Sequence, residues 1–283
     1  MPENTTIYLT VDVDDYYDAE IFSGIIDKSE QMKYPSHVEK NTMDLLQLFD
    51  RHNVRGTFFI LGSVARRYPR LIRSILTSGH EVASHGYEHR MITKMSPLEF
   101  QEDVRESRKI LEDISGTNIL GFRAPTFSIV KRTEWAYEIL LDEGFQYSSS
   151  VFPIRHDRYG WPEFGIFPRK MAVSGNRWIW EVPLSVERVG CINVPFGGGG
   201  YLRFYPLFLT KYFFRRLLQI GRPAIVYVHP WEIDRQHPRI AMPVLKRMRH
   251  YVGISGTEKK MGNLLRSYTF ERMDQFLQCG QSE

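Results

Sequence analysis

Strand and helix signals alternate through the first half of this 283-residue chain, and this alternation limits the folds available to it. Apolar runs and helical periodicity predict strands at 6–13, 57–61, 80–85 and 120–123, and helices at 36–53, 64–78, 97–114 and 133–143. Strands joined by helices at this spacing run parallel, because a parallel pair needs a long crossover connection. The first half therefore predicts an α/β fold built on a parallel sheet or barrel.

The pattern changes after residue 150. Residues 150–205 are rich in glycine, proline and aromatic side chains, and the run at 197–200 reads as a flexible glycine loop. A helix is expected at 204–219, and an apolar strand then ends in His229. The last forty residues read as helix, strand and helix. Because no internal repeat or clear linker interrupts the chain, one domain with an elaborated second half is the simplest account.

Two carboxylates at the end of the first strand indicate a cation site. Successive side chains point to opposite faces of a strand, so Asp12 and Asp14 are expected to point the same way. Two buried like charges are destabilising unless a counter-charge compensates them. His85 and His89, four residues apart, supply matching ligands. One carboxylate and two imidazoles make a facial metal site with open positions for water and substrate.

Polar residues also end two later strands, where parallel α/β folds collect their catalytic groups. Arg123 ends the strand at 120–123, and His229 ends the late strand of the second half. Taken alone, each residue also has a structural interpretation, as a salt-bridged arginine or a hydrogen-bonded core histidine. Their joint occurrence in order with the carboxylates and the two earlier histidines favours a catalytic site.

The charge distribution bears on partners. A net charge of +4 is too small to indicate nucleic acid binding. The basic residues of the last third include Lys211, Arg215, Arg216, Lys246, Arg247, Arg249, Lys259 and Lys260. They read either as solvated helix faces or as a surface that docks on anionic lipid or an anionic glycan.

Several features of the sequence favour a cytoplasmic location. The chain has two cysteines, no basic leader at its start, and no apolar run of the roughly 18 residues that a membrane span needs. We therefore expect a cytoplasmic protein, with peripheral contact to a membrane or to exopolysaccharide machinery as a further expectation.

Four motifs in order carry a resemblance to a known family. TVDVDD (10–15), SHGYEH (84–89), GFRAPTF (121–127) and VYVHP (226–230) resemble the first, second, third and fifth motifs of the polysaccharide deacetylase superfamily, the NodB-homology or carbohydrate esterase family 4 proteins. The segments YSSSVFPIRHDRYG, GGGGYLR and HPWEID resemble the subgroup found with exopolysaccharide and exosortase loci. The likeness covers nearly the whole chain.

This resemblance implies a deformed (β/α) barrel and a metal-dependent N-deacetylase. It gives the metal ligands as Asp14, His85 and His89, and the catalytic residues as Asp12 (general base), Arg123 (which orients Asp12 and holds it ionised) and His229 (general acid). The metal in such enzymes is usually zinc, and cobalt and nickel accept the same ligands. Residues 1–150 would then form the metal-binding catalytic core, while residues 151–283 complete the barrel and supply the general acid.

Two motifs depart from the family pattern. The usual first motif is TFDDG, whereas the acids here are spread as Asp-Val-Asp-Asp. Asp14 shares a face with Asp12, but Asp15 is an alternative ligand if the strand ends early. In the fourth motif, Ser148 stands where an acid is expected. The acid that tunes the catalytic histidine is therefore open among Asp157, Glu232 and Asp234.

Substrate contacts are expected from Pro125, Tyr159 and Trp231, with Trp161 as a second indole that stacks on sugar. The turn after Pro125 is also expected to offer backbone N–H groups to the oxyanion of amide hydrolysis.

Three functions follow. The first is removal of an N-acyl group, acetyl above all, from a hexosamine in an exopolysaccharide or its lipid-linked precursor. The second is hydrolysis of a small cyclic or linear amide, as in allantoinase-like relatives. The third is a non-catalytic glycan-binding or assembly protein with a relict site, which the missing acid of the fourth motif motivates.

Overall fold

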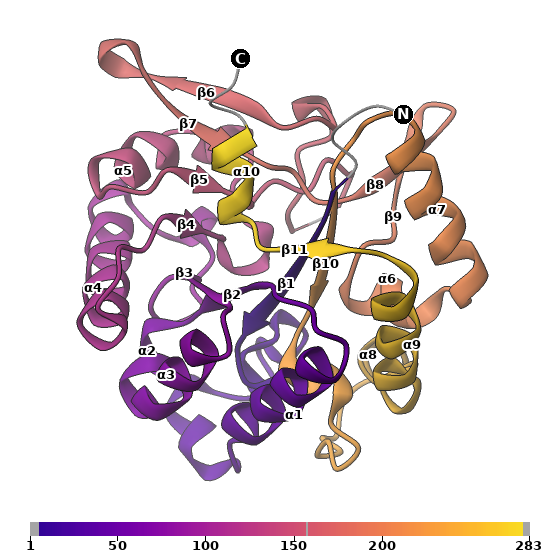
Figure 1. Cartoon of the computed structure of the whole chain (residues 1–283). Helices are drawn as coiled ribbons and strands as arrows, with labels where there is room; N and C mark the ends of the chain where they lie inside the picture. Colours follow the sequence, from indigo (N-terminus) through magenta and orange to yellow (C-terminus); the bar gives the residue numbers. More distant parts are fainter. Residues whose placement is uncertain (1–5, 157, 280–283) are drawn as a thin grey trace.

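A computed structural model describes residues 6–156 and 158–279 of the chain. Its main sheet joins strands in the order β10-β1-β2-β3-β4-β5-β7-β6, and β11 pairs with the first residues of β1 (Figure 1). The strands of this sheet are β1 (Ile7–Val13), β2 (Thr57–Ile60), β3 (Glu81–Ser84), β4 (Gly121–Phe122), β5 (Tyr147–Ser148), β6 (Arg169–Val173), β7 (Arg177–Glu181), β10 (Ala224–Val228) and β11 (Phe270–Glu271). A separate antiparallel hairpin joins β8 (Val186–Val189) and β9 (Ile192–Pro195).

Helices connect the parallel strands, as the alternation of the sequence predicted. The α-helices are α1 (Val38–Arg51), α2 (Gly62–Arg67), α3 (Pro69–Thr77), α4 (Pro97–Ser115), α5 (Ala136–Asp142), α6 (Gly199–Phe204), α7 (Leu207–Gln219), α8 (Val244–Tyr251), α9 (Ile254–Ser267) and α10 (Asp274–Cys279). Short 3-10 turns include η1 (Tyr16–Asp18), η2 (Glu20–Phe22), η3 (Lys28–Lys33), η4 (Ile92–Lys94), η5 (Pro125–Phe127), η6 (Lys131–Thr133), η7 (Pro162–Phe164), η8 (Ser174–Asn176) and η9 (Pro230–Ile233). Only β6 and β7 pair antiparallel in the main sheet of the described residues, so the predicted deformed (β/α) barrel is confirmed.

Prolines and caps explain where the helices begin and end. The helix expected at 64–78 is two helices, because Pro69 starts α3 after a break at Tyr68. The helix expected from residue 204 begins only at Leu207, after Pro206. Ser96 caps α4 in a reciprocal pair with Glu99. Helix α1 starts after His37 without a side-chain cap.

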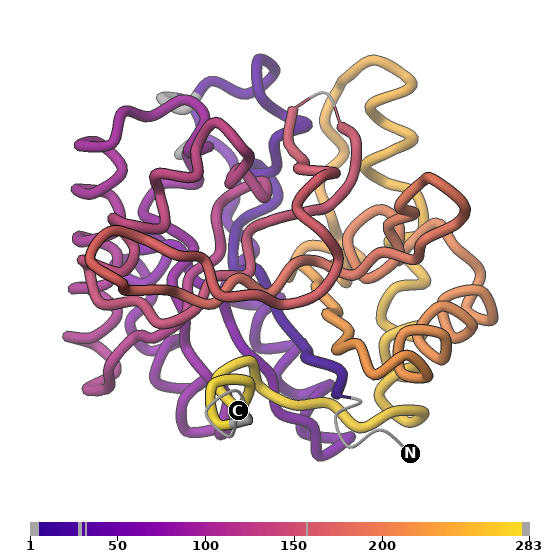
Figure 2. The backbone as a smooth tube through the Cα atoms, turned by 90° about the horizontal axis from the view of Figure 1, so that it is seen from above, coloured from indigo at the N-terminus to yellow at the C-terminus, as the bar shows by residue number. Residues whose placement is uncertain are grey.

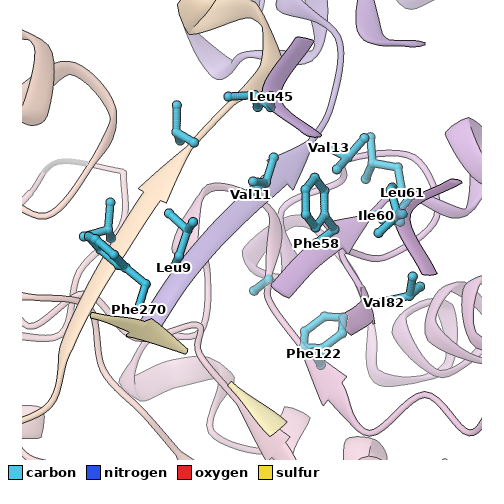
Figure 3. Close-up of a cluster of buried hydrophobic side chains, with 14 of the residues drawn as sticks. Leu9, Val11, Val13, Leu45, Phe58, Ile60, Leu61, Val82, Phe122 and Phe270 are labelled. Carbon is cyan, nitrogen blue, oxygen red and sulfur yellow. The ribbon is translucent and has the colours of Figure 1, made fainter. Parts of the chain in front are cut away.

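The two faces of β1 belong to different parts of the interior. Leu9, Val11 and Val13 pack in the larger apolar cluster with residues of the surrounding helices, such as Leu45 of α1 (Figure 3). Tyr8 belongs to a second cluster that includes Phe59, Ala83, Tyr147 and Tyr227 from other strands of the sheet. The alternation of a strand places Thr10 and Asp12 on the same face as Tyr8. Asp12 therefore points to the inside of the curved sheet.

The two halves of the sequence meet along β1. Strand β10 of the second half pairs with β1 from Ile7 to Val11, and β2 of the first half pairs with its other edge from Thr10 to Val13. Helices α1–α5 lie mainly on one side of this strand and α6–α9 on the other (Figures 1 and 2). In the described residues no helix combines the length and the apolar composition that crossing a bilayer requires.

The sequence predicted a flexible loop for the glycine run at 197–200. The structure shows that this prediction is wrong. It packs against β10, where Gly198 forms an isolated parallel bridge with Tyr227. A Cβ atom on Gly197 would lie 2.4 Å from the Ile225 carbonyl oxygen, and one on Gly198 would lie 2.3 Å from the Tyr227 carbonyl oxygen. These glycines are therefore needed for close approach of two backbones.

Candidate active site

Asp14, His85 and His89 converge at the carboxyl end of the parallel strands. Each offers one ligand atom, and these atoms lie within 4.8 Å of one another. The Oδ1 atom of Asp14 is buried with no hydrogen-bond partner among the described residues, while its Oδ2 lies 3.6 Å from Nε2 of His89. Two imidazoles beside an unsatisfied buried carboxylate oxygen are a donor set that suits a divalent cation such as zinc. The three residues therefore fit the metal that the sequence motifs imply.

The loop after β3 holds the two histidines in place. The Nδ1–H group of His85 donates to the carbonyl oxygen of Arg123 at 2.8 Å, which leaves Nε2 free to ligate. Burial lowers the pKa of His85 to about 4, so its ring is neutral at pH 7, as a ligand must be. His89 has a φ of 52°, and a non-glycine residue in the left-handed region stores strain of the kind found at functional sites.

Asp15 lies outside this cluster. Its side chain caps η1 by accepting from the backbone N–H of Tyr16 at 3.1 Å, and it also accepts from the N–H of His37 at 3.3 Å. Because these bonds turn the carboxylate toward the helix start, the geometry favours Asp14 over Asp15 as a ligand.

Arg123 is fully buried and holds Asp12. Its Nη1 donates to Asp12 Oδ1 and to Thr10 Oγ1, both at 2.7 Å, and its Nε and Nη2 donate to the carbonyl and hydroxyl oxygens of Ser149. Burial alone would raise the pKa of Asp12, but the charges of Arg123, His85 and His229 lower it overall. Through its side chain and its carbonyl group, one arginine thus positions both Asp12 and His85.

His229 faces Asp12 from the end of β10. Its Nε2 lies 4.0 Å from Asp12 Oδ2, and its Nδ1 bonds Oε1 of Glu232. Burial alone would lower the pKa of His229, but the charges of Asp14, Glu232 and Asp12 outweigh it and raise the pKa to about 9. The imidazole is therefore poised to carry a proton on the side of the site that faces Asp12.

Glu232 is the acid that pairs with His229. It is fully buried, and its Oε2 forms an ion pair with Arg203 Nε at 3.0 Å. The other candidates are excluded or untested: Asp234 bonds His37 and Asn41, and Asp157 lies outside the described residues. The missing acid at Ser148 is thus compensated from the turn that directly follows the histidine.

Several supporting residues escaped sequence analysis. Thr10 and Ser149 hold the guanidinium, and Arg203 holds Glu232. Ser148 donates to Ser150 Oγ at 2.7 Å, and the buried Glu181 accepts the backbone N–H groups of Ser150 and Val151 at 2.7 and 2.8 Å. The only signal was the serine run after β5, which marks short polar side chains at a strand end.

The substrate contacts expected from Pro125, Tyr159 and Trp231 stay predictions. Pro125 is buried at the start of η5, and the N–H of Phe127 is bonded to the Ala124 carbonyl oxygen rather than open to an oxyanion. Tyr159 stacks on His156, with ring centroids 3.8 Å apart. Trp231 is 5% exposed and stacks with His229 and His250, and Trp161 is 6% exposed. Neither indole presents a ring face to solvent, so their expected stacking on sugar is not supported.

A cavity of about 600 Å³ opens beside His89. Its lining comes from the segment 17–31 and from residues 88–94, and it includes His89. Cavities of this size accommodate ligands as large as a typical drug molecule. The cavity is therefore the natural candidate for the part of the substrate that lies beyond the reacting group.

Comparison with known families now defines the class. Residues 2–141 match the family model described as polysaccharide deacetylase, so the first half of the chain is similar to that family. Residues 149–278 match a second model, a domain of unknown function designated DUF3473. This second match covers the segment that supplies Arg203, His229 and Glu232.

Relatives match about a third of the chain. Similar proteins include a peptidoglycan-N-acetylglucosamine deacetylase of Bacillus cereus, 30% identical over 98 residues, which are 34% of this chain and 36% of the relative. Another is the peptidoglycan-N-acetylglucosamine deacetylase PgdA of Listeria monocytogenes, 34% identical over 91 residues, which are 32% of this chain and 20% of the relative. The matches thus span about a third or less of these relatives.

Solved structures resemble nearly the whole fold. A Mycobacterium smegmatis structure assigned to the polysaccharide deacetylases has a TM-score of 0.64 at 20% identity and covers 99% of this chain and 91% of its own. The PuuE allantoinase has a TM-score of 0.61 at 16% identity, with 96% and 89% covered. The BA3943 pseudoenzyme of Bacillus anthracis has a TM-score of 0.52 at 13% identity, with 97% and 66% covered. At these identities the likeness shows the fold alone.

Proposed function

We propose that this protein is a metal-dependent hydrolase that removes an N-acyl group, acetyl above all, from a hexosamine of a glycan. The observation that carries the proposal is the convergence of Asp14, His85 and His89 with Asp12 and His229 at one end of the sheet. Zinc is the metal we assign, and cobalt or nickel would suit the same ligands.

Each group has a task in amide hydrolysis. A divalent ion held by Asp14, His85 and His89 would polarise the amide carbonyl and acidify water. Asp12, fixed by Arg123, accepts the proton of the attacking water. His229 Nε2 lies across the site from Asp12 and donates a proton to the leaving nitrogen, because an amine does not leave as an anion.

The glycan is proposed to be an exopolysaccharide or its lipid-linked precursor, modified in the cytoplasm. Deacetylation of a hexosamine is supported by relatives named as peptidoglycan-N-acetylglucosamine and chitooligosaccharide deacetylases. The cavity beside His89 supports a substrate larger than a small amide. A small-amide hydrolase like the allantoinase, or a site that binds glycans without turnover, are the alternatives that the experiment must separate.

Acetate release tests the proposal. The protein loaded with zinc is incubated with N-acetylglucosamine oligomers, with N-acetylated exopolysaccharide and with allantoin. Acetate from the glycans and no hydrolysis of allantoin are expected, and Asp12→Ala should lower kcat by about 10²- to 10⁴-fold while metal stays bound. Binding of glycans without acetate release in the metal-loaded protein would favour the relict site.

Metal content provides a matched control. We expect Asp14→Asn to lose zinc, as measured by elemental analysis after dialysis. Asp15→Asn should retain it, since Asp15 caps η1 and an asparagine preserves such a cap. The reverse result would transfer the ligand role to Asp15.

A further inference from the structure

Five large apolar side chains form an exposed surface on the second half of the chain. We call this the α6–α8 face and define it by Phe204, Phe208, Val244, Leu245 and Met248. These side chains are 69%, 75%, 64%, 64% and 64% exposed, respectively. Single exposed apolar residues are ordinary, but several on neighbouring elements mark an interaction site.

Hydrogen bonds join the end of α6 to the C-terminal end of α8. The side chain of Arg203 bonds the carbonyl oxygens of His250 and Val252, so the end of α6 is held to the end of α8. A Cβ on Gly253 would lie only 2.7 Å from the Arg203 carbonyl oxygen. Phe204 is thereby adjacent to the 250–253 segment, and Phe208 follows it across Pro206.

The segments that carry this face contain basic residues but no acidic ones. No aspartate or glutamate occurs at residues 196–231 or 235–257. The same segments contain six cations on α7 and α8, namely Lys211, Arg215, Arg216, Lys246, Arg247 and Arg249. Among them, Arg216 is paired with Glu187 of β8. The face therefore combines apolar side chains with a surplus of positive charge.

We infer that the α6–α8 face docks on the surface of an anionic lipid bilayer. Helices that lie in a membrane interface combine exposed apolar side chains with lysine and arginine, and the cations are attracted by anionic headgroups. A second copy of the chain is disfavoured as occupant, because two such faces would repel each other. An anionic glycan alone would leave the apolar side chains exposed to water.

The α6–α8 face is linked to the candidate general acid through stacked side chains. His250 of α8 stacks on Trp231 with ring centroids 4.7 Å apart, and Trp231 stacks on His229 at 5.1 Å. A bilayer under α8 therefore lies close to the site where an N-acyl group would be cleaved. The proposed lipid binding does not depend on the proposed hydrolysis, because a protein without turnover would bind lipid in the same way.

Vesicle co-sedimentation of the full chain tests the inference. Binding is expected to vesicles of phosphatidylcholine mixed with phosphatidylglycerol, to weaken with added salt, and to be far weaker with phosphatidylcholine alone. Replacing Arg247→Gln and Arg249→Gln together should weaken binding about twenty-five-fold, on the basis of about fivefold per cation. Met248→Gln should weaken it about tenfold through the lost apolar contact.

Matched variants elsewhere are the controls. Leu98→Gln changes a side chain of α4 that is 66% exposed, and Lys131→Gln with Arg132→Gln removes two exposed cations of η6. Neither should alter vesicle binding, and thermal unfolding confirms that every variant is folded. The inference is overturned by no binding, by equal binding to neutral vesicles, or by equal losses in the controls. A solution dimer that Met248→Gln dissociates would also overturn it.

Discussion

At the scale of single residues, the site depends on a buried acid that takes the place of the acid missing from the fourth motif. Glu232 follows His229 by three residues, so one turn of η9 brings the two side chains together. The sequence gave Glu232 as one of three candidates for the acid that pairs with His229. The structure excludes Asp234, because its side chain bonds His37 and Asn41 instead. Arg203, 29 residues before Glu232, gave no signal at all, because its partner is fixed by packing of α6.

Replacing Glu232→Gln should expose the role of this pair. We expect kcat to fall about 10²-fold with little change in KM, because the imidazole loses the partner that orients it. Glu232 is one of the charges that raise the pKa of His229, so its removal lowers that pKa. A general acid works only while protonated, and the alkaline limb of the kcat/KM profile should therefore move to lower pH.

The pH–rate profile of Asp234→Asn provides the comparison for this prediction. Asp234 lies two residues further along and bonds His37 rather than His229. We expect its alkaline limb to match that of the unmodified protein. An unchanged limb in Glu232→Gln would show that Glu232 does not tune the acid.

At the scale of elements, the C-terminal segment seals the end of the sheet opposite the site. Glu81 at the start of β3 accepts hydrogen bonds from the Thr57 hydroxyl of β2, from the Tyr147 hydroxyl of β5 at 2.8 Å and from the N–H of Asp274 in α10 at 3.0 Å. Three elements distant in sequence thus converge on one carboxyl group. Burial, followed by the nearby charge of Asp274, raises the pKa of Glu81 to about 7.

This carboxyl group should make stability depend on pH. The folded chain keeps a proton on Glu81 up to about pH 7, whereas the unfolded chain releases it near the ordinary glutamate pKa of 4.5. The free energy of unfolding should therefore decrease by roughly 3 kcal/mol between these values and stay level above them. Glu81→Gln removes the titration, so urea unfolding at pH 5 and pH 8 should show a smaller difference.

The exposed Glu106 of α4 serves as control for that measurement. It pairs with Arg66 at the surface, and Glu106→Gln should leave the difference between pH 5 and pH 8 unchanged. If Glu81→Gln retains the full difference as well, another group carries the pH dependence.

At the scale of the whole molecule, the order of strands ties the two halves together. β1 lies between β10 of the second half and β2 of the first half, so each half contributes one neighbour to the same strand. The matches to two family models divide the chain near residue 145, yet the hydrogen bonds of the sheet cross that division. We propose on this basis that residues 1–283 fold as one domain.

Separate expression of residues 1–148 and 149–283 tests this proposal. The first fragment would leave one edge of β1 unpaired, so we expect neither fragment to fold alone. The first fragment would also lack the acid His229. The intact chain should show one unfolding transition by circular dichroism and by fluorescence. A well-dispersed NMR spectrum of either fragment, or two separate transitions, would divide the protein into two domains.

The sequence by itself determined the parallel α/β class, the order of the strands and helices of the first half, and the residues that gather at the site. Those features depend on local periodicity and on the ends of strands, which neighbouring residues specify. Tertiary structure alone decided that Asp15 caps η1, that Glu232 and Arg203 support His229, and that the glycine run packs on β10. These outcomes depend on contacts between residues far apart in the chain, and such contacts leave no periodic trace in the sequence.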